Sequence, residues 1–102
     1  MKESNAVTLQ SVISRNPEII HSAMDDEVVM MSVDQGLFFG IDKIGTHIWN
    51  LLENPAKVEG LIEKLVAHYD VEPELCKHDT LLFLNDMLVK KVILIEELEQ
   101  VV

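Results

Sequence analysis

The residue types that catalysis uses most often are few in this chain, and their spacing is poor. Cys76, His78 and Asp79 combine a thiol with two groups that could accept its proton. On one helix, however, residues i and i+2 point about 200° apart, so His78 cannot reach the thiol. The spacing favours a small core cysteine beside a surface histidine.

The sequence also lacks the residue patterns of a metal-binding or a nucleotide-binding site. The histidines have neither a second cysteine nor a paired spacing that would suit zinc, and His47 and His68 fit helix surfaces better. The glycines are isolated and form neither a phosphate-binding loop nor a dinucleotide fingerprint. We therefore predict no catalytic residue, no metal and no cofactor.

The net charge of the chain disfavours some kinds of binding partner. The chain has 102 residues, with 8 Lys and Arg against 18 Asp and Glu, which gives a net charge of −10. Such a surface repels phosphate backbones and anionic membranes, so we expect neither nucleic acid nor membrane as a partner. Hydrophobic residues make up 48% of the chain, a proportion that a folded protein needs and an acidic disordered tail lacks.

Length and cysteine content set the domain organisation and the compartment. We expect one domain over residues 7–96, a flexible N-terminus at 1–6 and a tail at 97–102. A single cysteine excludes an intrachain disulfide and is typical of a reducing compartment, so a cytoplasmic location is expected. No apolar run has the length of a signal peptide or a membrane span.

Period-2 patterns predict three strands. Residues 7–14 mix β-branched and polar residues before Asn16-Pro17, and residues 27–33 and 37–41 flank a turn signal. The last two should form a hairpin. Alternation places Leu37, Phe39 and Ile41 on one face of the third strand and Phe38 with Gly40 on the other.

The period then changes to that of helices. Asp42 suits the N-cap of a short helix that ends at Asn54-Pro55. Apolar residues recur at helical spacing over 58–69, and Pro73 suits the first turn of a third helix that runs to about Lys90. Residues 92–96 could be a final strand or an extended cover.

The third helix carries two apolar stripes. The wider one is the expected core arc and contains Cys76, Thr80, Phe83, Leu84, Met87 and Leu88. On roughly the opposite side lie Leu75, Leu82 and Val89, flanked by Asp79 and Asp86. The N-terminal strands, the C-terminal tail or a second copy could cover this second stripe. Alternatively, it is part of an acid-rimmed groove for an apolar, partly basic peptide.

The third strand raises a related question. If residues 37–41 end the sheet, their outer edge presents unpaired N–H and C=O groups. The N-terminal segment or residues 92–96 could cover that edge, or an extended peptide could pair with it.

A DNA-binding role is the alternative that this order of elements suggests. Strands with three helices suit a winged-helix regulator. The helix that would enter the groove, however, carries Lys77, Lys90 and Lys91 against four acids, namely Glu72, Glu74, Asp79 and Asp86. It is acidic where phosphates would lie. A small enzyme subunit is the other rival.

A family resemblance selects among these alternatives. Residues 38–52, FFGIDKIGTHIWNLL, resemble the signature YYGLNxxGxxIWxLL of the PqqD-like family. Residues 69–73 resemble its YDVxPE linker, and residues 79–84 its DVxxFL segment; the likeness covers about 27–95. Departures are Asp42 for Asn, Thr80 for Val, and the segment 91–93 for Gly-Leu-Val. Residues 1–26 resemble the extra strand region of stand-alone members from lasso-peptide gene clusters.

The resemblance implies both fold and function. The fold is α+β and winged helix-turn-helix-like, with a three-stranded antiparallel sheet followed by three helices. The function is non-enzymatic recognition of the leader segment of a ribosomal precursor peptide, which is presented to a processing enzyme. In lasso pathways that enzyme is a transglutaminase-like cysteine protease, followed by a cyclase. The oligomeric state stays open.

The resemblance also places the peptide. The leader would lie as an added strand beside residues 37–41, in the cleft that they form with the third helix. The expected peptide-binding residues are Leu37, Phe38, Phe39, Gly40, Ile41, Leu75, Asp79, Leu82, Asp86 and Val89. The core arc of the third helix is the competing contact face.

Overall fold

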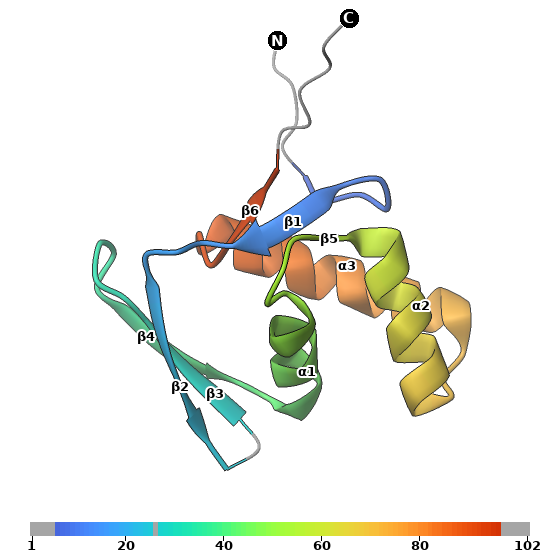
Figure 1. Cartoon of the computed structure of the whole chain (residues 1–102), viewed down its shortest axis with the longest axis horizontal. Helices are drawn as coiled ribbons and strands as arrows, with labels where there is room; N and C mark the ends of the chain where they lie inside the picture. Colours follow the sequence, from blue (N-terminus) through green and yellow to red (C-terminus); the bar gives the residue numbers. More distant parts are fainter. Residues whose placement is uncertain (1–5, 26, 97–102) are drawn as a thin grey trace, which may run out of the picture.

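The structure, a computed structural model, describes residues 6–25 and 27–96 (Figure 1). Within these ranges the chain forms two three-stranded antiparallel sheets and three helices, which confirms the predicted α+β class. The expected terminal segments fall almost wholly outside the described residues. In chain order the elements are β1 (Val12–Arg15), β2 (Ile19–Met24), β3 (Glu27–Ser32), β4 (Leu37–Ile41), α1 (Lys43–Leu51), β5 (Ala56–Lys57), α2 (Val58–Tyr69), α3 (Pro73–Val89) and β6 (Ile93–Ile95).

The sheet that matters for the site has the order β2-β3-β4. The hairpin predicted over 27–41 is present, with Val28 opposite Ile41 and Ser32 opposite Leu37. Gly36 closes its turn at a φ of 66°, a conformation that glycine adopts without strain. The strand β2 was not predicted. Apart from Ile19 its residues are all exposed, so they lack the alternation that marks a half-buried strand.

The strand expected over 7–14 is placed wrongly. It begins at Val12 and pairs with β5 and β6 in a second sheet instead of joining the predicted hairpin. Residues 8–11 form a turn, in which Ser11 N donates to Thr8 O at 3.0 Å and Thr8 N donates to Ser11 Oγ at 2.9 Å. The strand option for residues 92–96 is confirmed by β6.

Side chains cap the starts of α1 and α3, whereas α2 begins without a side-chain cap. The side chain of Asp42 accepts a hydrogen bond from Gly45 N at 2.8 Å and so begins α1. Glu72 accepts from Leu75 N at 3.0 Å ahead of α3, with Pro73 in the first turn as predicted. Asp70 ends α2 in the left-handed conformation.

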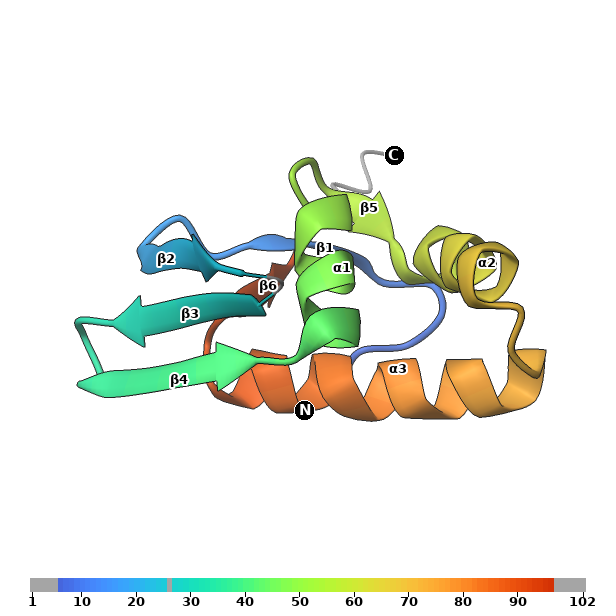
Figure 2. The same cartoon turned by 90° about the horizontal axis from the view of Figure 1, so that it is seen from below.

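The core lies between the helices and the inner faces of both sheets. Ile13 from β1, Met30 from β3 and Leu84 from α3 are all fully buried there. Figure 2 shows α3 running past the end of β4 and along the base of α1. On the other side of α3, Leu75, Leu82 and Val89 are exposed, so no described element covers them.

Leucine truncations on α3 should separate its two apolar stripes. Leu84→Ala removes a fully buried side chain and should lower the free energy of unfolding by about 2–5 kcal/mol. Leu82 is 60% exposed, so Leu82→Ala should change it by only about 0.5 kcal/mol or less. Urea denaturation of both variants measures the difference. Equal losses would place Leu82 in the core.

Candidate functional site

The outer edge of β4 is open in the part of the chain that the structure describes. β4 pairs with β3 on one side, and no described strand pairs with it on the other. Both segments that could have covered this edge, the N-terminal strand and residues 93–95, belong to the other sheet. Every second residue of an edge strand directs its N–H and C=O away from its partner. These groups on β4 are therefore available for a further strand.

A cleft of about 250 Å³ lies beside this strand, between β4 and α3. It combines apolar walls with charged groups at its rim. Residues 39–42 line it from the strand side, and α3 contributes Phe83, Asp86, Met87 and Lys90. Lys90 Nζ lies 2.9 Å from Asp86 Oδ2 and 5.3 Å from the centre of the Phe39 ring. The cleft thus offers apolar contacts together with one ion pair, between Lys90 and Asp86.

The structure brings together some of the residues predicted for the site. Phe39, Gly40, Ile41 and Asp86 line the cleft. Leu37 and Phe38 lie on the same strand but are exposed outside it.

The second stripe of α3 lies next to the cleft and not within it. Leu75, Leu82 and Val89 are 57%, 60% and 78% exposed, and Asp79 is exposed as well. At 100° per residue they lie within about 60° of Asp86 around the helix axis. The sequence therefore identified an uncovered apolar stripe, and this stripe borders the cleft.

Four lining residues were missing from the predicted set, namely Asp42, Phe83, Met87 and Lys90. Phe83 and Met87 belong to the core arc, so the competing face supplies part of the lining. Lys90 follows Asp86 by four residues, a spacing at which opposite charges meet on a helix, and this signal could have found it. Nothing comparable in the sequence marks Asp42, whose visible role is the helix cap.

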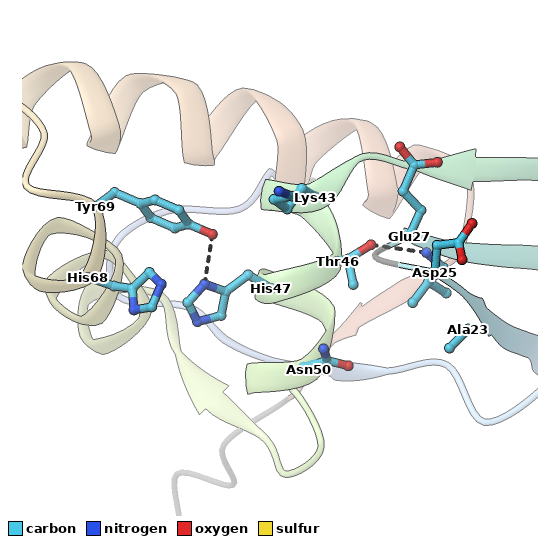
Figure 3. Close-up of a pocket in the computed structure, with 10 residues that line it drawn as sticks. Ala23, Asp25, Glu27, Lys43, Thr46, His47, Asn50, His68 and Tyr69 are labelled. Carbon is cyan, nitrogen blue, oxygen red and sulfur yellow. Dashed lines mark hydrogen bonds between the residues drawn. The ribbon is translucent and has the colours of Figure 1, made fainter.

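A second, larger pocket of about 430 Å³ lies between the β2–β3 turn, α1 and α2 (Figure 3). Its wall includes His47, whose Nδ1 lies 3.0 Å from the hydroxyl of Tyr69, and His68, whose ring centre is 4.7 Å from that of His47. The surface placement expected for His47 is wrong, because it is half-buried between the two helices; His68 is exposed as expected.

The groups in this second pocket do not form a nucleophile with its base. Thr46 Oγ1 accepts from Val28 N at 3.0 Å and donates to Ile41 O at 3.3 Å, so backbone groups hold this hydroxyl. Elsewhere, Cys76 packs against the core with its Sγ 3.8 Å from Thr80 Oγ1, while His78 is exposed. This matches the predicted core cysteine beside a surface histidine.

Among residues 6–25 and 27–96, no three His, Cys, Asp or Glu side chains come together in a group that could hold a metal ion. No helix in these ranges has the length and apolar character to cross a membrane.

The histidine pair makes stability depend on pH. Burial lowers the pKa of His47, and the neighbouring His68 lowers it further. Protonation of His47 therefore favours the unfolded chain, where histidine titrates near about 6.5. Above that pH, neutral His47 makes its full contribution to the free energy of unfolding. This contribution is lost as the pH falls through the lowered pKa of His47 in the folded protein.

We expect the free energy of unfolding to decrease between about pH 7 and pH 5 more steeply in the wild type than in His47→Gln. Urea titrations at several pH values give the two slopes. Parallel slopes would mean that His47 titrates alike in the folded and unfolded states.

Comparison with known proteins adds two likenesses. A family model described as coenzyme PQQ synthesis protein D (PqqD) matches residues 27–93. A solved structure of TbiB1 in complex with the TbiA(beta) leader peptide is similar to this chain, with a TM-score of 0.74 and 28% sequence identity. The similarity covers 85% of this chain and 99% of that one. No curated protein matches. The matched residues 27–93 include β4 and α3, and hence both walls of the cleft.

Proposed function

Since the chain belongs to the family of coenzyme PQQ synthesis protein D, as its sequence predicted, we propose that it binds the leader segment of a ribosomal precursor peptide. The observation that carries this proposal is the open edge of β4 beside the cleft with α3. The similarity to TbiB1, a protein solved with a leader peptide, supports it. The role is recognition and not catalysis.

The proposed mechanism is strand addition. An extended leader forms ladder hydrogen bonds with the free groups of β4, each contributing about 0.5–1.5 kcal/mol net. One or two apolar side chains buried in the cleft contribute about 1.5–3 kcal/mol each. Ordering the peptide offsets a good part of this gain. An affinity in the micromolar to high-nanomolar range, about −8 to −10 kcal/mol, follows.

Hydrogen bonds and side chains have different tasks in this mechanism. The backbone ladder fixes the register of the leader, whereas the cleft selects its sequence. Phe39, Phe83 and Met87 provide apolar contacts for an inserted side chain. The neighbouring stripe of Leu75, Leu82 and Val89 extends the apolar surface along α3. Asp79 and Asp86 favour a leader with basic residues, which should bind faster at low salt.

Electrostatics make DNA binding the weaker alternative. Lys77 on α3 lies 3.2 Å from Glu74, and Lys90 at its C-terminal end lies 2.9 Å from Asp86, so acids of the same helix pair with these two lysines. Asp79 is exposed on the same helix. A winged-helix shape with such a helix repels the phosphate backbone that it would have to approach.

The proposal extends to the partner enzyme. A leader-binding protein without catalytic groups of its own acts by presenting the precursor to the enzyme that processes it. We assign this chain the delivery of its precursor, in the cytoplasm, to a transglutaminase-like cysteine protease of a lasso-peptide pathway. Binding to the leader keeps the cleavage site near that enzyme and raises its effective concentration.

Titration of the folded protein with a synthetic leader tests strand addition directly. We expect backbone amide resonances of residues 37–41 to shift in heteronuclear NMR spectra, because a new strand changes their hydrogen bonding. A scrambled leader of equal composition serves as the control and should leave them unchanged. If calorimetry detects binding while these amides stay in place, the leader binds elsewhere.

A charge placed on the exposed stripe tests the side-chain contacts. Leu82→Asp should weaken leader binding about tenfold, which corresponds to about 1.4 kcal/mol, because it puts a carboxylate against an apolar contact. Leu94→Asp on β6 is the matched control, since Leu94 is exposed but belongs to the other sheet. Calorimetric titration of both variants gives the affinities. Wild-type affinity in Leu82→Asp would restrict the contacts to the cleft itself.

A further inference from the structure

The sheet β2-β3-β4 presents a second apolar surface on the face that points away from the core. Ile20 lies opposite Met31, and Met31 lies opposite Phe38, so the three side chains form one row across the sheet. We call this set the outer row. Its members are 52%, 38% and 72% exposed. Met24, on the same face of β2, is 60% exposed.

The two faces of this sheet differ in how they are covered. On the inner face, Val28, Met30 and Ile41 are buried in the core, and α1 lies on this side (Figure 1). No described helix packs over the outer row, as its exposure shows. Apolar side chains that line up across three strands and stay in solvent mark an interaction surface more often than a chance arrangement.

Charge around the outer row indicates the kind of partner. Residues 16–42, which contain all three strands, include six acidic residues and no Lys or Arg. Glu18, Asp25, Glu27 and Asp34 are all exposed at or beyond the ends of these strands. A second copy of the chain would bring the same acids and its own charge of −10, which opposes self-association. A complementary partner has an apolar patch rimmed by Lys and Arg.

We propose that the outer row is the surface on which the precursor-processing enzyme docks, an inference that rests on the proposed function. The row ends at Phe38 on β4, the strand whose free edge would receive the leader. An enzyme docked on this face lies next to the bound peptide without covering the cleft. The leader, added as a further strand, widens the same face with its own alternate side chains.

Single lysine substitutions test this surface. Ile20→Lys places a cation in the apolar contact and opposite a basic rim, at an exposed position on β2, the strand furthest from the leader edge. Val71→Lys is the matched control, because Val71 is 40% exposed in the connection between α2 and α3. The probe is the purified leader protease of the same gene cluster. The readouts are leader affinity by calorimetry, the rate of precursor cleavage, and the sedimentation behaviour of the protein.

We expect the Ile20→Lys substitution to change the cleavage rate but not the leader affinity. Ile20→Lys should bind the leader as tightly as the wild type and slow protein-dependent cleavage about tenfold or more, whereas Val71→Lys should leave both unchanged. Wild-type cleavage with Ile20→Lys overturns the docking surface, and so does an equal loss with Val71→Lys. A wild-type dimer that Ile20→Lys dissociates overturns it in favour of self-association. If the wild type itself does not bind the leader, the proposed function is refuted, and not only the docking surface.

Discussion

The cleft between β4 and α3 depends on the absence of a side chain at Gly45. A Cβ at this position would lie 3.0 Å from two ring atoms of Phe83 and 3.3 Å from Asp42 Oδ1. Because Gly45 has only a hydrogen there, the first turn of α1 lies directly against α3. Asp42 directly follows β4 and caps that same turn, so one short segment fixes the strand, the helix and the Phe83 ring together. The close packing of α1 against Phe83 thus fixes the positions of both walls of the cleft.

The N-terminal part of the chain explains why the edge of β4 stays open. Asn85 Oδ1 on α3 accepts a hydrogen bond from Val7 N at 2.8 Å, and β1 then lies between β5 and β6. Arg15 donates to Trp49 O at 3.2 and 2.8 Å, and its guanidinium lies 4.4 Å from the centre of the Trp49 ring. Burial lowers the pKa of Arg15. These contacts keep β1 in the second sheet, away from the outer edge of β4.

The sequence predicted those features that depend on local pattern. The helices follow from apolar spacing and from start signals such as Asp42 as a cap and Pro73 in a first turn, and the hairpin over 27–41 follows from its turn. The partner of β1 could not be predicted, because pairing with Ile93 joins residues far apart in the chain. For the same reason Phe83 looked like a core residue: its contribution to the cleft depends on where α3 lies against β4. The exposed stripe on α3 was predictable, because a helix that packs on the core with one face needs only one apolar stripe and this helix has two.

The charged rim decides how the cleft meets a peptide. In the free protein Lys90 pairs with Asp86 and lies over the ring of Phe39, so its stem covers part of the apolar wall. Both charged groups are more than a third exposed, so the pair contributes little, and a ligand can displace Lys90 at small cost. In the proposed complex, a basic leader residue that reached Asp86 would replace that pair and leave the Phe39 ring free for an apolar neighbour. In the proposed strand addition, one solvated ion pair would be exchanged for another, and the net gain in affinity would come from backbone hydrogen bonds and apolar burial.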